Sequence, residues 1–342
     1  MTPVDHPVAP RRPRRPPSGK AAMVFSGLAL ISILGLRRAD AAFTSERHVP
    51  ARRLLPPQAF AAATALGRSG GVKMRFAVAG EAVDFPLQLQ QSPDSLTYEW
   101  IPLDGVLPVG SARALTGTLR APERPGFYRL AVAGAGGRRI IEEVTLAVLV
   151  PFSEKRGSLL NGYRIGMYRG ERRGAAASVT APAGFIEVSE GDVQLPVSEH
   201  LSLADFLTRD DQTVWPRYAA LDARLLDKLE LVFAEIAKWR GGAQDSPVDV
   251  DVHSGYRTPL HNRRVNRAAN DSRHQLGDAA DVAVDVNRDG RISAKDIRLI
   301  ERAVEVVERR HPDLAGGLGV YTRNGAPYAH IDTRGTRVRW RG

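Results

Sequence analysis

The chain has 342 residues, which is enough for two domains. With 43% hydrophobic and 25% charged residues, the composition is globular and excludes disordered and fibrous classes. The formal net charge of +10 favours anionic partners such as wall polymers or membranes. The basic residues are spread along the chain without interleaved aromatics, so we predict no nucleic-acid partner. The absence of cysteine excludes disulfides, thiolate metal ligands and a cysteine nucleophile.

Residues 1–42 have the order of an export signal. A basic, proline-rich start is followed by an uncharged apolar run at 21–36 and by a small-x-small site from Ala39 to Ala41. The run is short for a membrane span, which needs about 20 residues. The two arginines directly after it are unusual for a cleavage region, so an uncleaved membrane anchor stays open. We therefore predict an exported protein, periplasmic or anchored in the inner membrane and facing the periplasm.

Residues 43–152 form the next predicted unit, an all-β module. Alternating apolar residues at 72–78, 127–132 and 140–150, separated by Gly, Pro and Asp clusters, are typical of short strands with regular turns. This pattern predicts a sandwich-like domain. No catalytic constellation is visible in it, so we interpret it as a spacer or recognition module. The turn-rich residues 153–218 are predicted to be a connector.

The last unit, residues 219–342, is predicted to be an α+β catalytic domain with a small, mainly antiparallel sheet. A helix is expected from Pro216 to Trp239, because apolar residues recur at three- and four-residue steps before Gly241 and Gly242. A second helix is expected after Asp296. The expected strands follow alternating apolar residues at 248–252, 282–284, 316–321 and 328–332.

A candidate metal site lies in this unit. His274 and Asp281 are seven residues apart in a loop that leads into a strand, and His330 lies in a later strand. Two imidazoles and one carboxylate form a zinc site with a fourth position open to water. Alone, a His seven residues before an Asp is weak support, because such pairs are often structural.

The order of several motifs strengthens the prediction. They are Ser254-Gly255-Tyr256-Arg257-Thr258-Pro259, Asn262, Ser272-x-His274-x-x-Gly277-x-Ala279-x-Asp281, Gly319-Val320-Tyr321, His330-x-Asp332, Arg337 and Trp340. Over roughly residues 247–342 the chain resembles the murein endopeptidase K-like zinc peptidases, which are related to D-Ala-D-Ala carboxypeptidases. The resemblance implies zinc ligands at His274, Asp281 and His330. It also implies hydrolysis of peptide cross-links in peptidoglycan stem peptides.

The catalytic roles beyond the ligands rest on Arg257 and Asp332. A guanidinium fixed by a turn suits developing negative charge, so Arg257 is the candidate oxyanion clamp. Related carboxypeptidases carry an acid three residues before the last ligand, but that position here is Pro327. Asp332 is the nearest acid and shares a strand face with His330. It is a candidate either for handling the proton or for orienting the ligand.

A second metal candidate is the segment 285–296, which resembles an EF-hand calcium loop. Oxygen-bearing residues occupy loop positions one, three, five, nine and twelve, glycine occupies position six, and position seven offers a main-chain carbonyl. The predicted calcium ligands are Asp285, Asn287, Asp289, Arg291, Ser293 and Asp296. Asp296 replaces the usual Glu, and a strand replaces the entering helix. A capped Asp/Asn/Gly turn without calcium is the alternative.

The sequence thus predicts an exported zinc metallopeptidase that cuts peptidoglycan cross-links, with calcium as a second candidate ion. Two alternatives stay open. One is a carboxypeptidase that removes terminal D-Ala. The other is a non-catalytic wall-binding protein with a degenerate peptidase fold, motivated by Pro327.

Overall fold

The structure, a computed structural model, describes residues 61–90, 92–106, 112–116, 118–172, 181–240, 248–322 and 326–342. The predicted signal or anchor within residues 1–42 lies outside these ranges. Within them, no helix has both the length and the apolar character that crossing a membrane requires.

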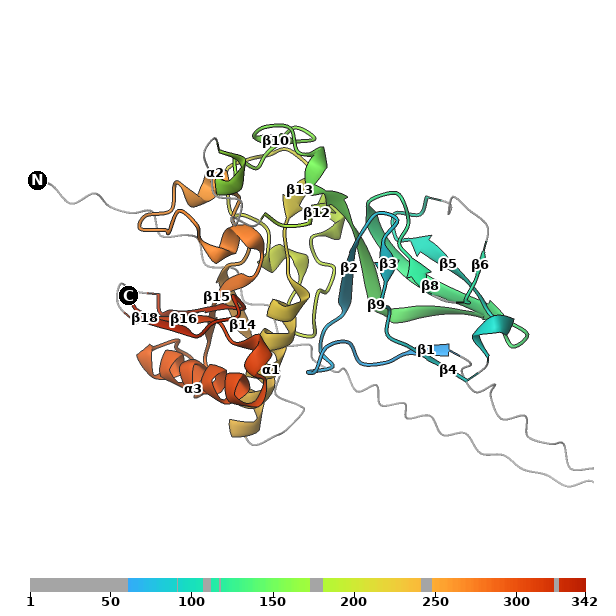
Figure 1. Cartoon of the computed structure of the whole chain (residues 1–342). Helices are drawn as coiled ribbons and strands as arrows, with labels where there is room; N and C mark the ends of the chain where they lie inside the picture. The colour runs from blue at the N-terminus through green and yellow to red at the C-terminus, as the bar shows by residue number, and fades with distance from the viewer. Residues whose placement is uncertain are drawn as a thin grey trace, which may run out of the picture. The chain divides into compact units, whose positions relative to one another are not determined.

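The larger sheet has seven strands in the order β13-β12-β9-β8-β5-β6, with β2 paired in parallel to β9 (Figure 1). Its strands are β2 (Met74–Val78), β5 (Thr97–Pro102), β6 (Arg113–Ala114), β8 (Gly126–Gly134), β9 (Gly137–Pro151), β12 (Gly184–Val188) and β13 (Arg217–Ala219). The first five belong to the predicted β module and the last two to the predicted connector. The structure therefore does not show the β module as a sandwich of its own, because its sheet continues into the connector.

Smaller pieces complete this part of the chain. They are the two-stranded sheets β1 (Ala61–Ala63) with β4 (Leu87–Leu89), β3 (Ala82–Val83) with β7 (Leu119–Arg120), and β10 (Leu159–Leu160) with β11 (Tyr163–Arg164). Five 3-10 turns are η1 (Pro93–Ser95), η2 (Phe152–Glu154), η3 (Arg169–Glu171), η4 (Glu190–Asp192) and η5 (Leu203–Asp205). A separate apolar core within the β module includes Phe85, Tyr98 and Trp100.

The C-terminal part contains the second sheet and the longer helices. Its elements are α1 (Ala223–Trp239), β14 (Val250–Ser254), α2 (Pro259–Asn262), η6 (Arg273–Leu276), β15 (Ala279–Val284), α3 (Ala294–Arg310), η7 (Pro312–Leu314), β16 (Gly317–Tyr321), β17 (Tyr328–Asp332) and β18 (Val338–Arg341). The predicted first helix starts seven residues later than expected from Pro216. The reason is that Asp222 caps it by accepting a hydrogen bond from the Arg224 amide, while Arg217–Ala219 pairs as a strand.

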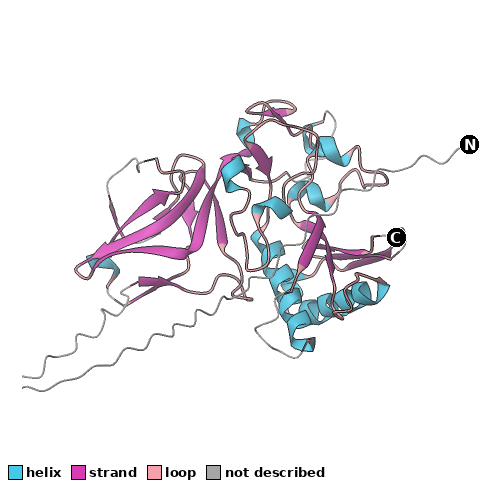
Figure 2. Ribbon diagram, turned by 180° about the vertical axis from the view of Figure 1, so that it is seen from behind, coloured by secondary structure: helices cyan, strands magenta, loops and turns pink. Residues whose placement is uncertain are grey.

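The second sheet has the order β14-β15-β17-β16-β18, antiparallel except for the parallel pair β16 and β18. This confirms the small, mainly antiparallel sheet. Helices α1 and α3 contact one another, and α3 packs against β15, β16 and β17 (Figure 2). The buried face of α1, with Leu225, Leu229 and Ile236, joins Val282 and Ile331 in one core. Alternation along the strands then turns Asp281 and His330 to the other face.

Gly277 ends η6 and fixes where the ligand loop enters β15. Its φ is +76°, and a Cβ there would lie 2.2 Å from the Ala220 carbonyl oxygen. We expect Gly277→Ala to lower the free energy of unfolding by about 2 kcal/mol or more, measured by denaturant titration. Gly290→Ala is the matched control, since Gly290 has a φ of +80° and open space around it. Equal losses in both variants would contradict the steric part of this argument.

Candidate metal centre

Two loop segments place the first ligand residue. Thr258 caps α2 by accepting from the His261 amide, and its own amide donates to Thr208 Oγ1 at 3.0 Å. Gly255 lies so close to Asp205 and Phe206 that a Cβ would meet the Asp205 carbonyl at 2.6 Å. The Ser254–Asn262 turn therefore packs closely against residues 205–208. On its other side, the Arg257 amide donates to the His274 carbonyl at 3.1 Å. The turn and η6 are thereby held together.

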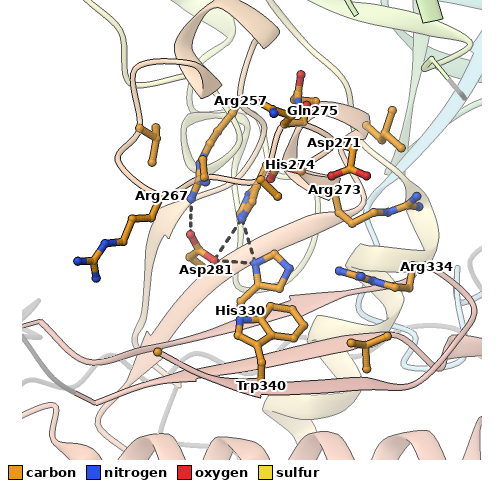
Figure 3. Close-up of a pocket in the computed structure, with 18 of the residues that line it drawn as sticks. Arg257, Arg267, Asp271, Arg273, His274, Gln275, Asp281, His330, Arg334 and Trp340 are labelled. Carbon is orange, nitrogen blue, oxygen red and sulfur yellow. Dashed lines mark hydrogen bonds and ion pairs between the residues drawn. The ribbon is translucent and has the colours of Figure 1, made fainter. Parts of the chain in front are cut away.

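Strand register brings the three predicted ligands to one point. Asp281 of β15 lies opposite His330 of β17, and η6 places His274 above them (Figure 3). His274 Nε2 lies 3.2 Å from Asp281 Oδ1 and 3.1 Å from His330 Nδ1, and His330 Nδ1 lies 2.9 Å from Asp281 Oδ1. All three residues are buried. Within the described residues they are the one group of three or more His, Asp or Glu whose ligand atoms lie within 4.8 Å of one another.

This donor set fits zinc. Tetrahedral coordination with bonds of about 2.0–2.1 Å places neighbouring ligand atoms about 3.3–3.4 Å apart, and the separations of 2.9–3.2 Å seen here are slightly shorter. The remaining nitrogen of each imidazole has its own acceptor: His274 Nδ1 lies 2.6 Å from the Gly255 carbonyl, and His330 Nε2 lies 3.2 Å from Asp332 Oδ2. Such contacts fix the tautomer, so that His274 Nε2 and His330 Nδ1 point their lone pairs at the centre.

The charges of the three groups depend on one another. Burial lowers the pKa of His274. Burial would raise the pKa of Asp281, but the charge and hydrogen bonds of His274 and His330 outweigh it and hold that pKa below its usual range. For His330, hydrogen bonds to Asp281 and Asp332 outweigh burial and raise the pKa. A metal ion at this point therefore competes with a proton on His330.

Arg257 contacts the carboxylate of Asp281, one of the predicted ligands, directly. Its Nη2 donates to Asp281 Oδ2 at 2.5 Å and its Nε donates to Ser254 Oγ at 2.7 Å, and its side chain is 14% exposed. Asp281 thus offers Oδ1 to the centre while Arg257 holds Oδ2. This ion pair adds an orienting role to the predicted one, and Arg257 also lines the pocket.

Asp332 lies on the far side of His330 from the centre. Oδ2 contacts His330 Nε2, Oδ1 accepts from the Gly317 amide at 2.6 Å, and both oxygens accept from Arg334. Its side chain is fully buried. This geometry favours the second of its two predicted roles, the orientation of His330.

A pocket of about 1150 Å³ opens over the three predicted ligands. The segment from Val265 to Leu276 lines much of it, and Tyr321, Tyr328 and Trp340 contribute aromatic side chains. Among the described residues that line it, the acids are Asp271 and Asp281, and Asp271 pairs with Arg169 at 3.6 Å. The sequence motifs gave no sign that Tyr168 and Tyr328 line the pocket, since neither belongs to a motif, and they assigned no role to Tyr321 or Trp340.

The predicted calcium loop adopts a tight turn that closes on itself. Asp285 accepts from the amides of Asp289 and Gly290, and Asp296 accepts from the amides of Val286, Asn287 and Ser293. Asp296 is buried as part of the capping box of α3. The three aspartates are not among the close ligand groups found in the described residues. Calcium binding at this loop stays a prediction.

Comparison with protein families bears on these residues. Residues 195–340 match the family model described as peptidoglycan L,D-endopeptidase MepK. The C-terminal domain is thus similar to this family over these residues. The match begins within the segment predicted to be a connector, in keeping with the packing of residues 205–208 against the Ser254–Asn262 turn. No curated protein and no solved structure matches the chain.

Proposed function

We propose that this protein is a zinc-dependent endopeptidase that hydrolyses peptide cross-links of peptidoglycan in the cell envelope. The observation that carries the proposal is the convergence of His274 Nε2, Asp281 Oδ1 and His330 Nδ1 beneath an open pocket, in a domain of a peptidoglycan endopeptidase family. Bound zinc supplies a Lewis acid for the scissile carbonyl and activates water for the attack.

The residues of the chain then have distinct tasks. His274, Asp281 and His330 hold the metal, and Arg257 keeps the Asp281 carboxylate in its orientation. Arg257 lines the same pocket, so its guanidinium also suits the negative charge that develops on the carbonyl oxygen. Asp332 fixes the His330 ring.

The pocket and the charge of the chain fit an extended anionic substrate. A cavity of about 1150 Å³ has room for a branched peptide, and the arginines lining it include Arg169, Arg267 and Arg273. A net charge of +10 attracts the protein to anionic wall polymers. The basic start and apolar run within residues 1–42 are the features that support export.

The proposal is tested by digesting purified sacculi with the zinc-loaded full chain and measuring the masses of the released products by mass spectrometry. We expect cross-linked muropeptide dimers to be converted to monomers. Loss of terminal D-Ala with dimers intact would favour the carboxypeptidase alternative instead.

The non-catalytic alternative has one observation in its favour. Pro327 occupies the position where related carboxypeptidases carry an acid, and Asp332 is engaged by His330 and Arg334. Two results together would favour a wall-binding protein over the endopeptidase. The protein would bind one equivalent of zinc, and it would sediment with sacculi without releasing peptides from them.

A further inference from the structure

A buried ion pair lies behind the candidate metal centre, on the helical side of the sheet. Lys228 of α1 and Glu308 of α3 both have fully buried side chains, and Lys228 Nζ lies 2.8 Å from Glu308 Oε1. Desolvation makes such a pair costly, and apolar residues of similar size often serve stability as well or better. Its presence here therefore calls for a role besides stability.

The pair is bonded to the main chain at the ends of two site strands. Lys228 Nζ donates to the Asp332 carbonyl at 2.7 Å, at the end of β17. Glu308 Oε1 accepts from the Gly316 amide at 3.0 Å, directly before β16. Gly316 itself is so close to Asp332 that a Cβ would lie 1.9 Å from the Asp332 carbonyl oxygen. Two helices thus clamp the point where β16 and β17 meet.

This clamp fixes the residue that orients a metal ligand. Lys228 holds the carbonyl of Asp332, and the carboxylate of the same residue lies against His330 Nε2 and accepts from the Gly317 amide. A shift of the Asp332 main chain would therefore move the group that sets the His330 ring. None of these contacts involves a residue of the pocket wall other than His330.

We propose that Lys228 and Glu308 are positioning residues that set the metal affinity of the site by fixing Asp332 against His330. The proposal rests on the zinc site of the proposed function. Lys228 on α1 acts on the metal site through two intervening residues, Asp332 and His330. Removal of a partner of a ligating histidine lowers metal affinity by about 10–100-fold in other proteins.

The test measures zinc affinity by competition with a chromophoric chelator, with the full chain. We expect Lys228→Met to weaken zinc binding about tenfold or more. Lys238→Met is the matched control, because Lys238 lies on the same helix with a side chain 64% exposed and pairs with Glu235. Its zinc affinity is expected to equal that of the wild type. A folded Lys228→Met variant that binds zinc within twofold of the wild type overturns the proposal.

A second set of variants separates positioning from folding. Lys228→Met with Glu308→Gln removes both buried charges, which avoids a lone buried charge. Arg337 and Arg339 also pair with Glu308, and in this variant both keep their pairs with Glu305. We expect this double variant to melt cooperatively near the wild type in the zinc-free state while its zinc affinity stays low. Wild-type zinc affinity in the double variant would refute the proposal, including the case where Lys228→Met alone fails to fold.

The route through Asp332 has its own readout. In an Asp332→Ala background, Lys228→Met should weaken zinc binding little further, because the link to His330 is already gone. Losses that add independently would instead show a general structural effect. These measurements of zinc affinity do not depend on peptide cleavage. A wild-type protein that binds zinc but releases no peptides would refute the proposed endopeptidase function, and the positioning role of Lys228 could still be tested. A wild type that binds no zinc overturns both.

Discussion

Replacing His274 with alanine is expected to abolish the release of peptides from purified sacculi. The variant loses one of three donors at the centre, the Nε2 atom that lies 3.1–3.2 Å from the other two. Loss of the metal removes several kcal/mol of transition-state stabilisation, so the rate should fall at least about a thousandfold. Product release is measured by chromatography and mass spectrometry, alongside the zinc content of the purified variant.

The control for this variant is His311→Ala. His311 lies at the C-terminal end of α3 and is not among the residues that line the pocket. It should keep both zinc and activity. Full activity in His274→Ala would refute the zinc role of the site.

Replacing Arg257 with lysine is expected to reduce the rate of cleavage about a hundredfold, and its effect on zinc distinguishes two roles. Arg257 bonds Asp281 Oδ2 and Ser254 Oγ through different nitrogens, a geometry that a lysine ammonium does not reproduce. If its main task is to orient Asp281, zinc affinity falls about 10–100-fold. If its main task is to stabilise the oxyanion, kcat falls about 10²–10³-fold with zinc affinity preserved.

Both outcomes are measured on the same preparation, by chelator competition and by steady-state cleavage of a cross-linked muropeptide dimer. Arg264→Lys is a suitable control, because Arg264 is exposed and forms a surface pair with Asp211 at 3.2 Å. Unchanged affinity and unchanged kcat in Arg257→Lys would exclude Arg257 from the site chemistry.

The local sequence pattern predicts most of the helices and strands of the C-terminal part. Ile297, Ile300 and Val304 form the buried face of α3, the helix expected after Asp296, and Ser293 caps its start. These features depend on near neighbours in the chain, so periodicity and capping residues suffice to predict them. The start of α1 was missed, because the pairing of Arg217–Ala219 with Gly184–Val188 is a long-range contact.

The N-terminal part shows where local pattern fails. Alternation predicted its strands but not their partners, and the sheet extends through β12 and β13 beyond the boundary expected at residue 152. Partner choice in a sheet is decided by packing across the whole structure rather than by the strand itself. The family match likewise extends beyond the range expected from the motifs. It starts at residue 195 rather than near residue 247, and so includes part of the predicted connector.

By itself, the sequence determined the residue types of the site and their order along the chain. His274, Asp281 and His330 were predicted as a metal site because imidazole and carboxylate groups bind zinc, and because their motifs follow the order of the family that the chain resembles. Only the tertiary structure decided which atom each residue presents. The pairing of β15 with β17 sets Asp281 beside His330, and the far nitrogen of His330 selects Asp332 as its partner. Arg257 is bound to Asp281 for the same reason: residues 24 positions apart become neighbours only when the turn packs on the sheet.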